Sequence, residues 1–452
     1  MSNFAAHPDD APSLLDDLIR QARRLGADAA DAVLFDSMAL SLTVRLGTIE
    51  RLERSEGGDL GLRVLVGRRQ AIVSTSDRRP AALRDLVERA VAMARVVPED
   101  PFCGLADPEA VAHGPFPDLD MFDPTEPSAE TLIAAARLAE DSARAVPGIT
   151  NSEGADAGWS QSRIWLAASN GFAGGYRRSG SSLSVAVLAG EGTAMERDYD
   201  FSSAVHRSDL ESPAEVGRRA GEKTVRRLNP RKVPSCKVPV VFDPRVANGL
   251  IGHLAGAING TAIARGTSFL KDFLHKPVFA PHIQVVDDPH IRRGLRSKPF
   301  DGEGMATRRQ AFIADGCLTS WLLDLRSARQ LGLASTGHAA RGTSGPPGPA
   351  ATNFYLLPGA PTPAALMADI AEGFYVTDLM GQGVNGLTGD YSRGATGFWI
   401  RNGQLEHPVN EVTIAGNLKD MFSSLEPAND LVFRYGVDCP TVRVGSMTIA
   451  GL

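Results

Sequence analysis

Residues 242–260, with the sequence FDPRVANGLIGHLAGAING, predict one helix of about four turns in the second half of the chain. Asp243 is a suitable N-cap, Pro244 fits the first helical position, and Gly260 is placed to end the helix. The apolar residues recur at helical spacing and share one face: Val246, Leu250, Leu254 and Ala257. His253 falls within this stripe, so we expect its side chain to point inward or into a cleft.

The sequence around this helix predicts a mostly β C-terminal domain over residues 235–452, with the helix near residues 244–259. Asp315-Gly316 and Asn402-Gly403 each lie between apolar runs, which is typical of β-hairpins. Two glycine-rich loops, at residues 337–353 and 381–397, interrupt this part of the chain.

The first half of the chain predicts two mixed regions of helices and strands. Residues 1–100 combine flanking helices with about four antiparallel strands, which are separated at glycines that include Gly57-Gly58. Residues 128–234 form a central α+β region with a hairpin signal at Asn170-Gly171. The proline-rich residues 101–127 predict a linker or an extended wrap. The fold class is therefore expected to be α+β.

The composition excludes several classes of protein. Of the 452 residues, 43% are hydrophobic, which rules out a mainly disordered chain. The net charge of -6 provides no overall field for nucleic acid or an anionic membrane, so we expect neither as a partner. The four cysteines lie far apart, and the N-terminus has no apolar signal segment. We therefore expect no disulfide framework and a cytoplasmic location.

The sequence next to His253 provides no complete metal site. A zinc hydrolase needs two or three converging ligands and a carboxylate that takes a proton from the bound water. Leu254, Ala257 and Ile258 follow His253 at one, four and five positions, and none of them can ligate a metal or act as a base. His253 is therefore either a core histidine with one satisfied hydrogen bond or a residue of a binding site.

Asp301 and Glu303, in the stretch DGEGMATRR, form a second candidate site. Their spacing of two places both carboxylates on one face of an extended chain, where they can bind a cation or an amine. The alternative is a solvated, glycine-rich turn, because aspartate and glycine favour turns.

The loop at residues 381–397 is the third candidate site. Its glycines allow backbone amides to approach a peptide carboxylate or carbonyl closely. The polar and aromatic side chains that we assign to substrate or partner binding are Asn385, Asp390, Tyr391, Ser392 and Arg393. No histidine is placed by the sequence to complete a catalytic triad with the serine. The alternative is an ordinary loop in which Asp390 and Arg393 pair with each other on the surface.

Several of these stretches together resemble the TldD/PmbA family, whose members are sometimes described as modulators of DNA gyrase, and more specifically its PmbA (TldE) branch. The resemblance covers nearly the whole chain. The stretches that carry it are FDPRVANGLIGHLAGAINGTAIARGTSFL, DGEGMATRR, GQGVNGLTGDYSRGATGFWI and PVNEVTIAGNLKDMF.

The resemblance implies a protease complex in which this chain holds no metal. The TldD branch carries His-Glu-x-x-x-His and a later cysteine in a Cys-Gly-Lys stretch. Here His253 matches the first histidine, but Leu254 and Ile258 replace the glutamate and the second histidine, and Cys439 lies in a different context. The resemblance implies a metalloprotease complex, whereas these residues indicate no catalytic residue, metal ligand or cofactor in this chain. Zinc is expected in a TldD-like partner of a heterodimer that degrades or trims unfolded peptides, and the isolated chain can also pair with itself.

Two other functions remain open from the sequence. The chain can be an autonomous hydrolase that uses its carboxylates and the loop at residues 381–397 without a metal, or a regulatory protein that binds a partner such as DNA gyrase. For a peptide-processing subunit, an exposed sheet edge among the N-terminal strands can take up an extended substrate by strand addition. Alternatively, these strands pair only within their own sheet.

Overall fold

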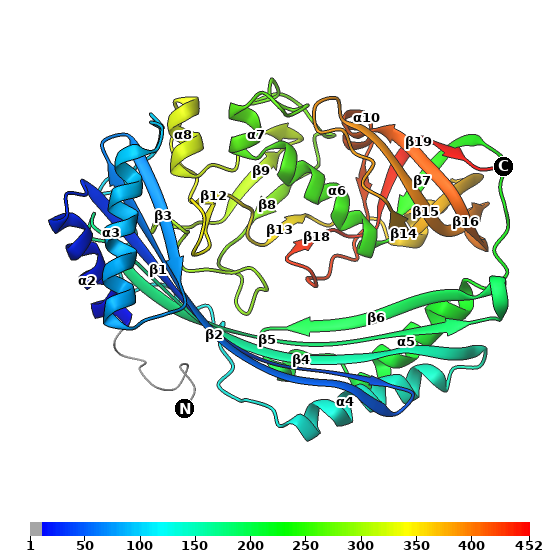
Figure 1. Ribbon diagram of the computed structural model, residues 1–452. Coiled ribbons are helices and arrows are strands. Elements are labelled where there is room, and N and C mark those ends of the chain that lie inside the picture. The colour runs from blue at the N-terminus through cyan, green and yellow to red at the C-terminus, as the bar shows by residue number, and fades with distance from the viewer. Residues whose placement is uncertain (1–10) are drawn as a thin grey trace.

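A computed structural model describes residues 11–452 (Figure 1). A long curved sheet forms one side of the molecule, and a body made of the C-terminal residues lies over one face of this sheet. Helices cover the opposite face near the two ends of the sheet. The expected α+β fold class is confirmed. Residues 1–10, on which the expectation about a signal segment rests, lie outside the described part.

The helices vary from five to 17 residues. Across residues 11–452, no helix is both long and apolar enough to span a bilayer. The helices are α2 (Ala11–Arg24), α3 (Pro80–Val96), α4 (Ala129–Arg144), α5 (Pro213–Arg226), α6 (Pro244–Ala257), α7 (Gly260–Ala264), α8 (Leu325–Leu331), α9 (Pro363–Met367) and α10 (Leu418–Ser423).

The long sheet has six antiparallel strands in the order β3-β2-β1-β4-β5-β6. Its central ladder pairs β1 with β4, from Asp31↔Ala168 to Val44↔Ala155. The expected regions 1–100 and 128–234 therefore share one sheet, and each contributes a helix, three strands and a second helix in the same order. The strands are β1 (Ala29–Arg45), β2 (Thr48–Val66), β3 (Arg69–Thr75), β4 (Ile149–Ala168), β5 (Ala173–Ala189) and β6 (Glu196–Ala204).

The expected strand break at Gly57-Gly58 is wrong, because both glycines lie inside β2. The first region therefore contains three strands rather than about four, and β2 runs for 19 residues. The glycines serve close packing instead of a turn. A Cβ atom on Gly58 would lie 2.3 Å from Nη2 of Arg78 and 2.5 Å from Oδ1 of Asp36, which form an ion pair beside the strand.

The side-chain alternation of β1 assigns the two faces of the long sheet. Apart from Asp36, the even-numbered side chains of β1 pack in two cores, one under α2 and α3 and the other under α4 and α5. The odd-numbered Asp31 and Val33 face the C-terminal body, where they meet Arg341 and Phe300. This face of the long sheet therefore packs against the C-terminal body.

Residues 101–127, expected as a linker or an extended wrap, contain no helix and no extended strand. The carbonyl of Leu105 accepts a hydrogen bond from Nη2 of Arg329, and the backbone N–H of Ala112 donates to the carbonyl of Gly304 at 2.8 Å. The segment is thus held against the C-terminal body rather than free in solution.

The expected mostly β character of the C-terminal part is confirmed. Its larger sheet has the order β16-β15-β14-β7-β19-β17 and bends so that β16 also pairs with β19. The strands of this sheet are β7 (Cys236–Phe242), β14 (Glu372–Met380), β15 (Asp390–Arg401), β16 (Gln404–Asn417), β17 (Glu426–Pro427) and β19 (Val442–Ala450).

A second sheet of the C-terminal body has five strands in the order β10-β9-β8-β13-β18. They are β8 (Val285–Asp287), β9 (Gln310–Ala314), β10 (Cys317–Leu318), β13 (Phe354–Leu356) and β18 (Val437–Asp438). A two-stranded ribbon pairs β11 (Ala339–Ala340) with β12 (Gly348–Pro349). Helix α6 contacts β14 of the larger sheet and β13 and β18 of the smaller one, so it lies between them.

Helix α6 begins at Pro244, as predicted, and ends at Ala257 rather than at residue 259. Asp243 caps its start by accepting a hydrogen bond from the backbone N–H of Arg245 at 3.1 Å. Its end comes earlier because Asn259 caps the next helix, α7, by accepting from the backbone N–H of Thr261 at 3.0 Å.

Candidate functional site

His253 lines a cavity of about 300 Å³ beside α6, which we call the α6 cleft. The other walls of the cleft come from residues 267–269, residues 382–386 and Leu418. The buried apolar stripe of α6 packs into the core of the C-terminal body. The half-buried imidazole therefore lies at a cleft and not within the core.

The surroundings of His253 favour a neutral imidazole. Its ring packs edge-on against Tyr391, with centroids 6.1 Å apart and planes at 78°. Burial lowers the pKa of His253, and the positive charge of Arg393 lowers it further. Burial also raises the pKa of Tyr391 to about 12, so the phenol stays protonated. Within residues 11–452, neither ring nitrogen of His253 has a hydrogen-bond partner, so the imidazole can donate one bond to a ligand and accept another.

Asn385 and Asp390 use their side chains to hold the loop that walls the cleft. Oδ1 of Asn385 accepts a hydrogen bond from the backbone N–H of Leu387 at 2.9 Å. Asp390 accepts from the hydroxyl of Thr388 at 2.6 Å and from the side-chain amide of Asn417 at 3.1 Å. These hydrogen bonds lower the pKa of Asp390. The two residues therefore shape the loop.

Ser392 and Arg393 lie at the start of β15, at the same end of the loop. The backbone N–H of Ser392 donates to the carbonyl of Gly383 at 2.7 Å, and its side chain is exposed. Nε of Arg393 donates to the carbonyl of Met380 at 3.2 Å. Asp390 and Arg393 thus have different partners, and the alternative in which they pair with each other is wrong. His253 lines the cleft, and the positive charge of Arg393 acts on it from the neighbouring strand, so the two groups can bind a peptide carbonyl or carboxylate at this end of the loop.

Asp301 and Glu303 lie apart from the α6 cleft, in a turn that faces the long sheet. The turn expected as one alternative does form, with Gly304 at a φ of 78°. It is buried rather than solvated, because Asp301 is 1% exposed and Glu303 is 7% exposed. The extended conformation expected for a shared cation or amine site is not present, because residues 302–304 bend the chain.

The two carboxyls of this turn differ in the number of hydrogen bonds that they accept. Asp301 accepts from the backbone N–H groups of Glu303, Met305 and Ala339 at 2.9–3.0 Å. Glu303 accepts one such bond, from Leu325 at 2.8 Å. Burial, followed by the nearby charge of Asp301, raises the pKa of Glu303 to about 8. Burial also raises the pKa of Asp301, but its three donors oppose this. The protonated form is therefore favoured at Glu303, whereas the three backbone donors favour the ionised form of Asp301 against its burial.

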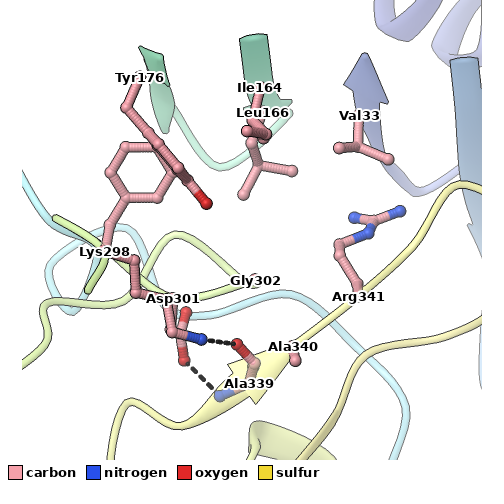
Figure 2. A pocket seen from close by; sticks show the side chains of 11 residues that line it. Val33, Ile164, Leu166, Tyr176, Lys298, Asp301, Gly302, Ala339, Ala340 and Arg341 are labelled. Carbon is pink, nitrogen blue, oxygen red and sulfur yellow. Dashed lines mark hydrogen bonds between the residues drawn. The ribbon is translucent and has the colours of Figure 1, made fainter. Parts of the chain in front are cut away.

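A set of buried and partly buried charged side chains lies beside this turn and was not expected from the sequence; Figure 2 shows two of them, Lys298 and Arg341. Asp31 accepts from Nε of Arg63 at 2.9 Å and from Nη1 of Arg341 at 2.6 Å, and these three side chains are 2–3% exposed. Lys298 donates to the carbonyl of Ala339 at 3.1 Å. We call Asp31, Arg63, Lys298 and Arg341 the Asp31 cluster. It joins residues that are 310 positions apart, so no local pattern could have revealed it.

The residues present do not fit a zinc ion. Within residues 11–452, no three His, Cys, Asp or Glu side chains converge as a metal site. Leu254 and Ile258, where the resemblance implies a glutamate and a histidine in the TldD branch, are completely buried. Cys439 is also buried, which raises the pKa of its thiol and keeps it protonated. His253 is thus the one residue of the TldD-type motif that reaches the cleft.

The fold is α+β, with a cleft between helix α6 and a glycine-rich loop, and residues 11–452 bring no metal-ligand set together. Three family models match successive parts of the chain: PmbA/TldA metallopeptidase domain 1 over residues 30–94, the central domain over 122–228 and the C-terminal domain over 235–451. The chain belongs to the PmbA/TldA metallopeptidase family, and the resemblance found in the sequence is confirmed.

Similar proteins extend over nearly the whole chain. Metalloprotease PmbA of Escherichia coli O157:H7 is 39% identical over 97% of this chain and 96% of its own length. A PmbA homolog of Haemophilus influenzae is 37% identical over 96% of this chain and 94% of its own length.

Solved structures share the fold over nearly the whole length of this chain. A Bacteroides thetaiotaomicron protein, described as a candidate modulator of DNA gyrase, aligns with a TM-score of 0.90 and 28% identity over 98% of this chain and 99% of its own. TldE from Thermococcus kodakarensis aligns with a TM-score of 0.87 over 97% and 100% of the two chains. At 20% identity, that likeness is one of fold alone.

Proposed function

We propose that this chain is the non-catalytic subunit of a cytoplasmic zinc metalloprotease complex. Its partner is a TldD-like chain that supplies the zinc ion, and the heterodimer degrades or trims unfolded peptides. Membership of the PmbA/TldA metallopeptidase family supports a protease-related role. The relatives named metalloprotease PmbA support the same assignment.

The replacement of two motif positions on α6 by core residues carries the proposal. A metal ligand must reach the metal, and a general base must reach the metal-bound water. Leu254 and Ile258 belong to the hydrophobic core of the C-terminal body and have no exposed surface. His253 alone cannot form a catalytic zinc site, since such sites normally use three protein ligands. The α6 cleft is therefore assigned to binding, and the chemistry to the partner.

A free strand edge supports the peptide-binding part of the proposal. β3 pairs with β2 only from Leu60 to Val66, and within the described residues no strand pairs with the outer edge of β2 from Thr48 to Asp59. The side chains of β2 in this part are largely exposed. An extended peptide can add to such an edge through main-chain hydrogen bonds, which do not depend on its sequence. Binding of this kind suits unfolded substrates, because it accepts extended peptides of different sequences.

The test compares the isolated chain, the TldD-like chain from the same genome, and the two together. Each sample is dialysed against zinc and then buffer, its zinc is measured by elemental analysis, and turnover is followed with an unfolded, fluorescently labelled polypeptide. We expect no stoichiometric zinc and no turnover for the isolated chain, and one zinc with turnover for the heterodimer. A TldD-like chain whose motif glutamate is changed to glutamine is the matched control, and its complex should assemble but not cleave.

Three results would contradict the proposal. One tightly bound zinc per isolated chain would show a metal site here, and turnover by the isolated chain would favour the autonomous hydrolase. Specific binding to DNA gyrase in the absence of any TldD-like chain, with no assembly between the two subunits, would favour the regulatory alternative.

A further inference from the structure

A second cavity, of about 490 Å³, lies between the edge strand β6 and the C-terminal body, and we call it the β6 cavity. Figure 1 shows β6 as the strand of the long sheet that runs beneath this body. Successive side chains of a strand point to opposite faces. Because Tyr199, Asp200 and Phe201 all line the cavity, it follows the outer edge of β6. Its volume lies within the range of small-molecule sites.

Aromatic rings form much of the wall of the β6 cavity. The ring centroid of Phe201 is 5.3 Å from that of Tyr435 and 6.4 Å from that of Tyr199, and Tyr375 lines the same space. All four side chains are half-buried, so each keeps accessible surface. Val432, which is 60% exposed, also lines the cavity. An exposed apolar side chain beside accessible rings favours an apolar or aromatic ligand.

The charged side chains that line the β6 cavity are already paired with protein groups. Asp200 lies 2.6 Å from Nε of Arg219 and 3.2 Å from Nζ of Lys223, and Arg434 pairs with Glu211. The remaining charged side chains also have partners: Asp243 with the hydroxyl of Tyr375 at 2.9 Å, Asp430 with the hydroxyl of Thr441 at 2.7 Å, and Arg245 with Asp198 at 2.7 and 3.0 Å. A charged ligand would therefore have to disrupt an existing pair.

Guanidinium groups already lie over two of the rings. Cζ of Arg434 is 5.6 Å from the ring centroid of Phe201, and Cζ of Arg245 is 5.4 Å from that of Tyr199. A cationic ligand would be repelled by these two positive charges. An uncharged aromatic ring can instead pack edge-on or offset against a ring, or stack on a guanidinium plane. The cavity therefore suits an uncharged aromatic group.

Two phenol hydroxyls are available to such a ligand. Among the uncharged polar side chains of this lining, Tyr375 and Thr441 donate to carboxylates, whereas the hydroxyls of Tyr199 and Tyr435 have no partner within residues 11–452. Neither of these two hydroxyls is fully buried, so a ligand atom can reach them. Burial, followed by the nearby Tyr199, raises the pKa of Tyr435, which therefore stays protonated and can donate. A ring with a hydroxyl or an N–H group can use both.

The main chain of β6 is less open than its side chains. The backbone N–H groups of Tyr199 and Phe201 donate to the carboxylates of Asp198 and Asp200 at 2.8 and 2.9 Å. The carbonyl of Phe201 accepts from Nη2 of Arg434 at 3.4 Å. These groups are therefore not free for strand addition. Recognition in the β6 cavity depends on the side chain of the ligand, in contrast to the open edge of β2.

We propose that the β6 cavity binds one uncharged aromatic side chain with a hydrogen-bonding group, as in tyrosine or tryptophan, with its ring against Phe201 and its polar atom on the hydroxyls of Tyr199 and Tyr435. The binding of such a ring stands on the cavity alone, and its source in an unfolded peptide rests on the proposed function. The edge of β2 then accepts peptides of any sequence, and the β6 cavity favours those with an exposed tyrosine or tryptophan.

The test measures binding to the full isolated chain by ligand-observed NMR titration, so that it does not depend on assembly with a TldD-like chain. The probes are the N-acetyl amides of tyrosine, tryptophan, leucine and arginine, and a capped pentapeptide with a central tyrosine among four glycines. We expect dissociation constants on the order of 1 mM for the tyrosine and tryptophan probes, including the pentapeptide. The leucine probe should bind about three- to tenfold more weakly, because it makes no ring contacts. The arginine probe should also bind more weakly.

Two variants test the assignment, and a third is the control. Phe201→Leu removes a ring but keeps an apolar side chain, and should weaken the aromatic probes about three- to tenfold while leaving the leucine probe nearly unchanged. Val432→Trp fills the cavity from an exposed position and should abolish binding, so the test stands even if the first variant folds poorly. Val96→Trp makes the same change at a valine that is 81% exposed at the end of α3, outside this cavity, and should bind like the parent chain.

The outcomes separate this inference from the proposed function. Equal binding of the leucine and tyrosine probes, parent-like binding by both cavity variants, or no saturation with any probe would overturn it. Tighter binding of the arginine probe would make the cavity a cation site and overturn it as well. Binding of the tyrosine amide with exclusion of the pentapeptide would assign the cavity to free aromatic molecules and overturn the peptide source. Failure of the subunits to assemble would not change any of these results.

Discussion

The substitution Glu303→Gln tests whether a buried carboxyl between the two bodies is protonated. Glu303 is 7% exposed, and burial together with the charges of Asp301 and Asp324 disfavours its ionised form, while Arg63 favours it. Glutamine has nearly the same shape and no charge, and its carbonyl can keep the hydrogen bond from the backbone of Leu325. The folded structure of the variant should therefore be close to that of the parent near neutral pH.

The direction in which the free energy of unfolding changes with pH follows from proton binding. The pKa of Glu303 is about 8 in the folded chain, against an ordinary value of 4.5, so the folded chain retains a proton that the unfolded chain releases. The free energy of unfolding of the parent therefore falls as pH rises from about 4.5 to about 8, and the variant lacks this loss. Each pKa unit corresponds to about 1.4 kcal/mol, which sets an upper limit of roughly 5 kcal/mol. Since protein interiors respond with a higher effective dielectric constant, we expect about 2 kcal/mol.

Urea unfolding of both chains at pH 5, 6, 7 and 8 measures this difference. We expect the urea midpoint of Glu303→Gln to exceed that of the parent at pH 8 and to approach it at pH 5, and the infrared band of a protonated carboxyl to disappear in the variant. Glu140→Gln is the control, because Glu140 is fully buried and accepts hydrogen bonds from Leu46, Gly47 and Ser152, so it should lose stability at every pH. Parallel pH curves for Glu303→Gln and the parent would refute the reasoning.

Three further predictions concern the interface and the α6 cleft. Gly61→Val should destabilise the chain by about 1–3 kcal/mol in urea unfolding, because a Cβ atom there would lie 2.1 Å from the carbonyl oxygen of Thr343; an unchanged midpoint would show that the contact relaxes freely. His253→Ala should leave peptidase turnover of the heterodimer within about threefold of the parent, with a modest loss of stability, and a well-folded complex without turnover would contradict its non-catalytic role. Asp390→Arg combined with Arg393→Asp should weaken assembly or peptide turnover about tenfold or more; if gel filtration and the turnover assay both match the parent, the loop is structural.

Features of the fold that depend on neighbouring residues were predictable from the sequence. The turns at Asp315-Gly316 and Asn402-Gly403 both place their two residues at positive φ, a conformation that these pairs favour, and each joins two strands as predicted. The start of α6 follows equally from Asp243 and Pro244. Gly57-Gly58 was misinterpreted because its role depends on an ion pair on other segments of the chain, which the local sequence does not contain.

The candidate sites show the same division between local and distant contacts. The apolar stripe of α6 was enough to predict that His253 points inward or into a cleft, but not that Tyr391 would contact its ring. The burial of Asp301 and Glu303 was not predictable, because backbone groups of Ala339 and Leu325 supply part of their hydrogen bonds. Prediction of such sites requires knowledge of which segments meet.

The ladder between β1 and β4 has a consequence for the synthesis of the chain. Residues 31–44 pair with residues 155–168, so β1 leaves the ribosome long before its partner exists. At translation rates of about 5–20 residues per second, the delay is roughly 5–25 s. During this interval the inner edge of β1 is open to pairing with other chains, which is a known route to aggregation. The first half therefore reaches its final strand pairing only after β4 has emerged.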